Sequence, residues 1–276
     1  MRISSIENMT GIIDAHLHFS RHAGMDRAAE AAGHVNTAEE LSRVFAECGI
    51  AGAVAMGTGG TPGVPEAHPL LAFCAGIRAG ELTPEQAPAI LDRTAEVLRN
   101  PHCVGLKFYC GYDPFYPHDA RFRPFYELAG TCGRPVVFHT GDTAWRHAKL
   151  KYAHPLEIDE VAADFPHTQF VIAHCGNPWI ADAVEVAAKN ENVAIDLSGL
   201  AVGKFDPDEL WTHYLDYWRM IRMWLVYLSD ETRIMYGSDW PLVNIPAYLE
   251  LMRRVVPETM HDAVFGANAR RIFRLT

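Results

Sequence analysis

The sequence predicts a single α/β domain over residues 1–276, folded as an eight-stranded (β/α)8 TIM barrel. The chain has 276 residues, close to the ~250 that are typical of such a barrel. Hydrophobic residues make up 49% of it, which is enough to bury a large core. Strand-like apolar runs alternate with helical patterns along the whole length, and this order favours βα units around a parallel sheet.

Short apolar runs mark the predicted strands. The first covers 11–18 and includes Ile12 and Ile13, whose β-branched side chains favour a buried strand. Runs of the same kind predict further strands at 50–56, 71–77, 104–108, 135–139, 170–174, 193–196 and 233–237. Eight strands, each with a helix, are the number that a closed barrel of this type requires.

Helical patterns lie between these runs. Thr37 is expected to be the N-cap of a helix over 37–48, with Glu40 as its capping-box partner. The pair Thr83-Pro84 begins a helix that continues to about residue 99. The remaining predicted helices cover 120–132, 156–164, 179–189, 207–228, 246–254 and 258–265. Two long loops, at 111–119 and 140–154, follow the fourth and fifth strands.

Charge and composition exclude several classes of function. The formal net charge of -10 argues against DNA or RNA as a partner, because surfaces that bind nucleic acids are basic. The apolar runs are far shorter than the ~20 residues that span a bilayer, and residues 1–10 lack the apolar core of a signal peptide. None of the six cysteines forms a C-x-x-C pair. We therefore expect a soluble cytoplasmic protein with reduced, buried cysteines.

Polar side chains gather at the carboxyl ends of the predicted strands. His16 and His18 end the first strand and point to the same face, about 7 Å apart along the chain. The other members of the set are, in chain order, Lys107, His139, His174, Asp196 and Asp239. Taken singly, each is more often a structural residue. Because all these ends meet at one face of a barrel, together they predict a metal site for zinc, or for iron, manganese or cobalt.

Five motifs at these positions resemble the amidohydrolase superfamily. They are Asp14-Ala15-His16-Leu17-His18, Gly105-Leu106-Lys107, Phe138-His139, Ala173-His174-Cys175-Gly176 and Gly237-Ser238-Asp239-Trp240-Pro241. The resemblance extends over about residues 11–272, and the most similar branch is the amidohydrolase-related (family 2) group of TIM-barrel hydrolases and decarboxylases. These motifs are specific to the superfamily but do not identify a substrate.

The resemblance implies a divalent metal, zinc first of all, held by His16, His18, His139 and Asp239. His174 would either bind a second metal or contact the substrate. Lys107 matches the position that is carbamylated in the binuclear members, where it bridges two metals. The number of metals therefore stays open at this stage.

A metal-activated water is the chemistry that this site would supply. A bound metal lowers the pKa of water to roughly 7 and polarises a scissile carbonyl. Asp239 would accept the proton from that water and pass it to the leaving group. The alternative is that Asp239 only ligates the metal and that His174 is the acid–base residue.

Three functions remain open on the sequence alone. The first is a hydrolase acting on a small amide, lactone or related ester. The second is a lyase of the same superfamily, either an aromatic acid decarboxylase or a hydratase. The third is an inactive binding protein on the same barrel, although the intact set of metal-type residues speaks against it.

The loop over 140–154 carries a local basic cluster on an otherwise acidic protein. It is expected to cover the pocket, with Arg146 binding an anionic group of a small-molecule substrate through its bidentate fork. Aromatic walls would come from Tyr109, Tyr112, Tyr116 and Trp179.

The predicted helix over 207–228 carries two apolar stripes, although one stripe is enough to cover the barrel strands. The second stripe includes Trp224 and Tyr227. One alternative is that this stripe packs on neighbouring helices of the same barrel. The other is that it forms an exposed apolar patch, and such patches usually mark an interface. We predict a two-fold homodimer that buries both residues.

Overall fold

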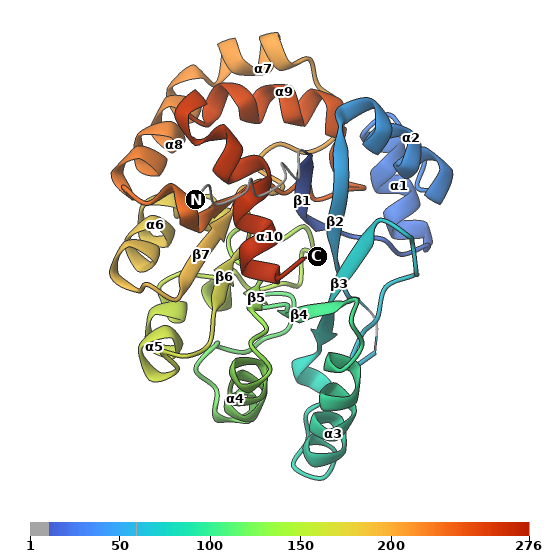
Figure 1. Cartoon of the computed structure of the whole chain (residues 1–276), viewed down its shortest axis with the longest axis vertical. Helices are drawn as coiled ribbons and strands as arrows, with labels where there is room; N and C mark the ends of the chain where they lie inside the picture. The colour runs from blue at the N-terminus through green and yellow to red at the C-terminus, as the bar shows by residue number, and fades with distance from the viewer. Residues whose placement is uncertain (1–10, 59, 276) are drawn as a thin grey trace, which may run out of the picture.

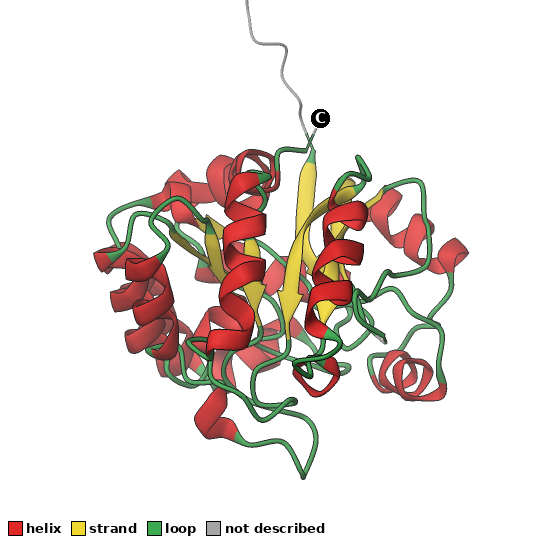
Figure 2. Ribbon diagram, turned by 90° about the horizontal axis from the view of Figure 1, so that it is seen from below, coloured by secondary structure: helices red, strands yellow, loops and turns green. Residues whose placement is uncertain are grey.

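Eight parallel strands follow one another around the barrel, in the order β1 to β8, in a computed structural model that describes residues 11–58 and 60–275. The strands are β1 (Ile12–Leu17), β2 (Ile50–Met56), β3 (Leu71–Ile77), β4 (Cys103–Phe108), β5 (Val136–Phe138), β6 (Phe170–Ile172), β7 (Val193–Asp196) and β8 (Ile234–Met235). The predicted TIM barrel is thus confirmed, and its strands point toward the loop-rich side at the bottom of Figure 2.

The barrel closes at the seam between β8 and β1, where single backbone hydrogen bonds replace a regular ladder. Ala15 N donates to Tyr236 O at 2.9 Å, and Asp239 N donates to His16 O at 2.8 Å. β8 is shorter than the predicted strand 233–237 because the chain after Met235 leaves the sheet. The turn that follows carries Asp239 directly beside β1.

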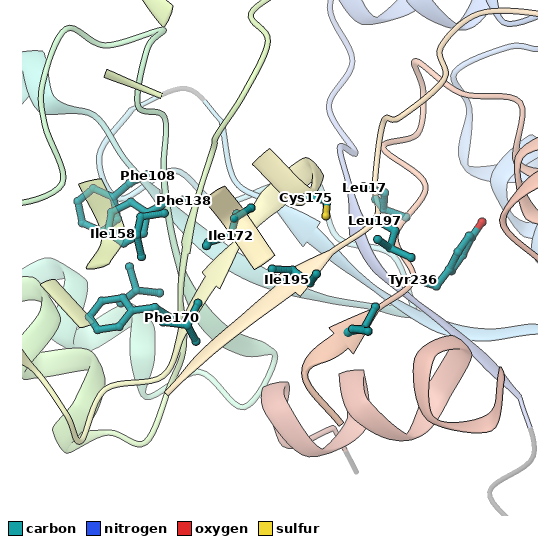
Figure 3. Close-up of a cluster of buried hydrophobic side chains, with 14 of the residues drawn as sticks. Leu17, Phe108, Phe138, Ile158, Phe170, Ile172, Cys175, Ile195, Leu197 and Tyr236 are labelled. Atoms are coloured by element: carbon teal, nitrogen blue, oxygen red, sulfur yellow. The ribbon is translucent and has the colours of Figure 1, made fainter. Parts of the chain in front are cut away.

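Two apolar layers stabilise the barrel. One fills its interior with residues from alternate strand positions, among them Ile13, Val54, Val104, Val137 and Val171. The other lies between the strands and the helices, where Phe108, Phe138, Phe170, Ile172 and Ile195 pack together (Figure 3). Because both faces of each strand are covered, the strands read as nearly continuous apolar runs rather than as alternating patterns.

Ten α-helices are present in the described part of the chain. They are α1 (Ala23–Ala31), α2 (Ala38–Cys48), α3 (Ala87–Leu98), α4 (Arg123–Thr131), α5 (Glu157–Asp164), α6 (Ile180–Lys189), α7 (Pro207–His213), α8 (Leu215–Tyr227), α9 (Ile245–Val255) and α10 (Asn268–Phe273). Thr37 caps α2 as predicted, because its side chain accepts a hydrogen bond from Glu40 N at 3.2 Å. The Glu40 carboxylate instead pairs with Arg43, so the capping box is not formed.

The helices differ from the prediction in three places. The sequence pattern did not reveal α1, since Ala29 is the one residue of this helix that is fully buried. The predicted helix 207–228 breaks at Tyr214, which ends α7 and precedes α8. The predicted helix 258–265 is replaced by a 3-10 turn (Glu258–Met260) and a π turn (Ala263–Ala267) that leads into α10.

The helix α10 closes the amino-terminal end of the barrel and crosses the middle of the view in Figure 1. Ala269, Ile272 and Phe273 are buried with the interior residues of the strands. Arg270 Nη2 donates to Gly11 O at 3.3 Å, just before β1 begins. Since this end is filled, a functional site is expected at the opposite, carboxyl end.

The outer face of α8 carries exposed apolar side chains. Tyr227 is 55% exposed, and Met223 and Val226 are exposed to a similar extent. Trp224 is half-buried, and its ring centroid lies 5.1 Å from that of Tyr227. The homodimer that would bury this pair stays a prediction. Light scattering at micromolar concentration should report a dimer, and a monomer there would reject it.

Within the described residues, the helices are all too short or too polar to cross a lipid bilayer. The cytoplasmic location expected from the sequence stays a prediction.

Candidate metal centre and substrate cavity

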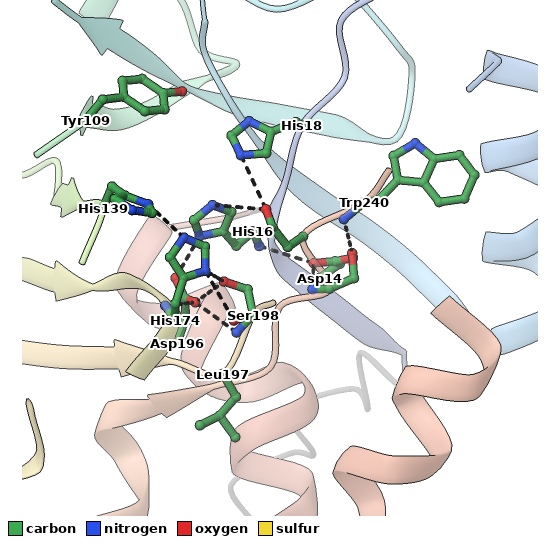
Figure 4. A network of polar contacts seen from close by, with 12 residues as sticks. Asp14, His16, His18, Tyr109, His139, His174, Asp196, Leu197, Ser198 and Trp240 are labelled. Atoms are coloured by element: carbon green, nitrogen blue, oxygen red, sulfur yellow. Dashed lines mark hydrogen bonds and ion pairs between the residues drawn. The ribbon is translucent and has the colours of Figure 1, made fainter. Parts of the chain in front are cut away.

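The polar residues predicted at the strand ends converge on one cavity of about 660 Å³ at the carboxyl end of the barrel. Those that line it are His18, Lys107, His139, His174 and Asp239. His16 is fully buried and lies among them (Figure 4). Residues up to 223 positions apart in the sequence (His16 to Asp239) thus meet because the parallel strands all end on this side.

His16 is held in one tautomer by Asp196. Its Nδ1 donates to Asp196 Oδ2 at 2.9 Å, so its Nε2 carries the lone pair. That Nε2 is buried without a hydrogen-bond partner and lies 3.9 Å from Asp239 Oδ1. Burial lowers the pKa of His16 to about 3, which keeps the ring neutral. The role of Asp196 is therefore to orient His16, as carboxylates behind metal-binding histidines do.

The rings of His139 and His174 each direct an unprotonated nitrogen toward the other ring. His139 Nε2 lies 3.0 Å from the carbonyl oxygen of Asp142, and His174 Nδ1 lies 3.2 Å from that of Ser198. Carbonyl oxygens only accept, so these two nitrogens donate. The remaining nitrogens, His174 Nε2 and His139 Nδ1, are 3.1 Å apart. Burial lowers the pKa of both rings, so two electron-pair donors meet with no proton between them.

Asp239 completes this set of donors. Its backbone lies in the left-handed region at φ 71°, which non-glycine residues adopt at an energetic cost and which concentrates at functional sites. Asp239 Oδ1 is buried, and His18 Nε2 lies 3.3 Å from it. Burial raises the pKa of Asp239, but the hydrogen bond with His18 and the neighbouring imidazoles outweigh this and lower it to about 2. The carboxylate is therefore ionised at neutral pH.

The donor set fits a divalent cation. Ligand atoms of His16, His174 and Asp239 lie within 4.8 Å of one another, and they form the one group of this kind among the described residues. His18 adjoins this group through Asp239, and His139 adjoins it through His174. Imidazole nitrogens and one carboxylate oxygen are common zinc ligands. A cation would satisfy lone pairs that otherwise face one another in a buried space.

Lys107 is fully buried in β4, and its Nζ has no hydrogen-bond partner among the described residues. Burial lowers its pKa to about 8, although the carboxylates of Asp196 and Asp239 act in the opposite direction. The ammonium lies 5.5 Å from the ring centroid of Tyr109. A buried amine with a lowered pKa is partly neutral, and therefore nucleophilic, near pH 8.

The loop over 140–154 lies over the cavity as predicted, but the residues by which it lines the cavity are not the expected ones. Ala144 and Trp145 line the cavity, and Trp145 is 61% exposed at its mouth. Arg146 is exposed and is not one of the described residues that line the cavity. The basic residues of the loop are likewise not among the described residues that line the cavity.

Two of the four expected aromatic walls lie in the cavity. Tyr109 and Tyr112 line it, and the Tyr112 ring packs 4.6 Å from that of His139. Trp179 packs on His154 outside the lining, with ring centroids 4.6 Å apart. Tyr116 instead stacks on His118.

Two features of the cavity were not predicted. Arg78, the residue after β3, lines the cavity, as does one face of α1 through Gly24, Met25 and Ala28. Arg78 stood alone after an apolar run, and Ala29 is the one residue of α1 that is fully buried. The one sequence signal that could have identified Arg78 as a site residue was its position directly after a strand, which is also where the histidines lie.

Comparisons with known proteins place the chain in a family. The family model described as amidohydrolase matches residues 13–275. The chain belongs to the amidohydrolase family. No curated protein matches the sequence.

Solved structures share the fold at low sequence identity. An amidohydrolase from Burkholderia multivorans with bound zinc is 19% identical, with a TM-score of 0.65 over 97% of this chain and 100% of that one. A protein from Pseudomonas putida described as a 2-pyrone-4,6-dicarboxylic acid hydrolase is 20% identical, with a TM-score of 0.63 over 96% and 97%. A 2,6-dihydroxybenzoate decarboxylase from Rhizobium is 14% identical, with a TM-score of 0.63 over 97% and 99%.

The neutral histidines predict a loss of stability in mild acid when the protein is free of metal. Below pH 6.5 the unfolded state protonates His16, His139 and His174, whereas burial keeps the native rings neutral. Asp14 acts in the opposite direction, because burial raises its native pKa to about 7 and the native state gains that proton first. His34 acts with the three histidines, because burial lowers its pKa too. The free energy of unfolding should therefore fall between pH 7 and 5.5, by an amount on the order of 2 kcal/mol.

Urea unfolding in the presence of a chelator, at pH 7 and at pH 5.5, measures the difference in the free energy of unfolding. Equal free energies of unfolding at both would show that the three histidines are not held neutral by burial.

Proposed function

We propose that this protein is a metal-dependent hydrolase of a small carbonyl compound. The observation that carries the proposal is the convergence of unprotonated donor atoms from His16, His139, His174 and Asp239 inside one cavity. When bound there, a divalent metal supplies acidified water and polarises a carbonyl group. Zinc is the first candidate, because the donors are imidazole and carboxylate and one structural neighbour holds zinc.

His16 and Asp239 are the ligands common to every assignment. The expected set adds His18 and His139, whereas the mutual distances favour His174 as the third ligand. Asp196 holds His16 in the required tautomer, and Ser198 Oγ, 2.9 Å from His174 Nδ1, helps to orient that ring. Both histidine ligands are thus positioned by a partner behind the ring, as is usual at metal sites.

Asp239 is proposed as the general base. Its carboxylate is ionised, faces the cavity and lies beside the cation position, so it accepts the proton of the attacking water at Oδ1. It then returns this proton to the leaving group. His174 is the alternative proton carrier, because its Nε2 is unprotonated and its ring lines the same cavity.

A second metal would involve Lys107 and His174. The neutral form of the Lys107 amine would form a carbamate with carbon dioxide, which would supply two further oxygen ligands. The one-metal assignment is preferred, since the donors of the described residues form a single group. Carbon-13 NMR of the folded protein, after incubation with carbon-13 bicarbonate near neutral pH, would detect the carbamate carbon.

A decarboxylase is the second candidate. It is favoured by the aromatic side of the cavity, where the rings of Tyr112 and Trp145 pack at 5.1 Å, and by the decarboxylase among the structural neighbours. A panel of lactones, amides and aromatic acids tests both candidates with the metal-loaded protein. Hydrolysis adds water to the substrate without release of carbon dioxide, whereas decarboxylation releases it. Binding without any turnover would favour an inactive binding protein.

A further inference from the structure

We propose that Arg78 is the specificity-determining residue of this site and binds a carboxylate of the substrate. The inference rests on the proposed function for the identity of the cavity as a substrate site. It adds a substrate class, which is a small, largely apolar carboxylic acid. No sequence motif pointed to this residue.

The register of the sheet brings Arg78 into the cavity. Ile77 of β3 pairs with Phe108 of β4, so the residues that follow them, Arg78 and Tyr109, lie side by side at the carboxyl end. The guanidinium carbon is 5.6 Å from the centroid of the Tyr109 ring. That ring is itself fixed, since its hydroxyl donates to the carbonyl oxygen of Gly57. Arg78 therefore packs against a rigid wall.

Asp113 holds the guanidinium in one orientation. Arg78 Nε and Nη2 donate to the two carboxylate oxygens of Asp113 at 3.0 and 2.6 Å. Asp113 is buried and also accepts from Ala79 N at 2.9 Å, so it is fixed from behind. An arginine held by such a fork loses little further freedom when it binds a ligand.

One face of the guanidinium remains available to a ligand. The hydrogen bonds between described residues use Nε and Nη2 and leave Nη1 unused. The side chain is 26% exposed, and it lines the same cavity as His139 and Asp239. A charged donor directed at a cavity is a typical recognition group for a carboxylate oxygen.

The other residues that line the cavity indicate the polarity of the part of the ligand beyond its carboxylate. Met25, Ala28 and Leu242 are apolar, and Tyr112 and Trp145 add aromatic surface. The charged lining residues besides Arg78 are Lys107 and Asp239, the second of which is a proposed metal ligand. Three guanidinium N–H groups stay free, two on Nη1 and one on Nη2, and this free edge matches the two oxygens of one carboxylate.

Ligand binding to the metal-free protein tests this inference separately from catalysis. Benzoate and its neutral isostere benzamide are titrated by calorimetry into chelator-treated wild type, Arg78→Gln and Arg146→Gln. Arg146→Gln is the matched control, because it removes the same charge near the mouth without touching the lining. Removing a charged hydrogen bond should weaken benzoate binding about tenfold to a hundredfold in Arg78→Gln. Benzamide binding, and benzoate binding by Arg146→Gln, should stay within about twofold of wild type.

Several outcomes would overturn the inference. One is unchanged benzoate binding by Arg78→Gln, and another is an equal loss in Arg146→Gln. A third is a wild type that binds no benzoate at about 1 mM. If Arg78→Gln does not fold, a crystal structure of wild type with benzoate decides, since its carboxylate should lie within hydrogen-bond distance of Nη1. Failure of the proposed hydrolase would appear instead as absent turnover with this binding intact.

Discussion

Asp239→Asn should keep the fold and lose about 10²–10⁴-fold of kcat/KM, the usual contribution of a positioned proton carrier. The amide is nearly isosteric with the carboxylate but does not accept a proton at neutral pH. The backbone hydrogen bond from Asp239 N to His16 O does not depend on the side chain, so the left-handed turn should persist. Steady-state kinetics with the substrate found in the panel measure the loss, and circular dichroism checks the fold. Because Asp239 is also a proposed ligand, the kinetics use variant protein whose zinc content equals that of wild type.

Asp142→Asn is the matched control for this experiment. Asp142 lies at the start of the loop that covers the cavity, but its side chain is exposed, and it is its backbone carbonyl that faces His139. Activity close to wild type is therefore expected. If Asp239→Asn keeps activity within a few-fold of wild type, Asp239 is not the general base, and His174 becomes the next residue to test.

His16→Asn should abolish stable metal binding. It removes the buried Nε2 that faces Asp239 and leaves Asp196 without its imidazole partner. Loss of one ligand should cost more than the 10–100-fold that is typical when only an outer partner is removed. Competition with a chromophoric zinc chelator measures the affinity of the variant against wild type.

His22→Asn provides the comparison. His22 also lines the cavity, but its Nδ1 caps α1 by accepting from Gly24 N at 3.2 Å. Asparagine is a good N-cap, so this variant should fold and bind metal like wild type. Equal affinities for His16→Asn and wild type would remove His16 from the ligand set.

The barrel and the residues of the site were predictable from the sequence because both depend on local signals. Strands that are buried on both faces read as apolar runs, and the carboxyl end of each run located His139, His174 and Asp239. The carboxylates that orient these site residues were not predictable from the sequence to the same degree. That Asp196 orients His16, and that Asp113 holds Arg78, depends on strand register and loop path, which no local pattern specifies.

The missed helices have equally physical causes. The helix α1 fully buries only the small side chain of Ala29, so it offers no run of large apolar residues by which it could be recognised in the sequence. No proline or glycine stands at Tyr214 to mark the break between α7 and α8, whereas Gly266 does lie within the π turn before α10. The cluster of basic residues in the loop at 140–154 led to the prediction that Arg146 binds the substrate. The arginine that lines the cavity is instead Arg78, which stands apart from any basic cluster in the sequence.

The central claim is that the converging donors of His16, His174 and Asp239 hold a metal. Elemental analysis by inductively coupled plasma mass spectrometry of the purified protein, after zinc loading and dialysis, tests it most directly. The account predicts about one equivalent of zinc per chain, lost in the His16→Asn variant and retained in His22→Asn. A wild type that holds no transition metal after loading, and whose turnover is unaffected by a chelator, would contradict it.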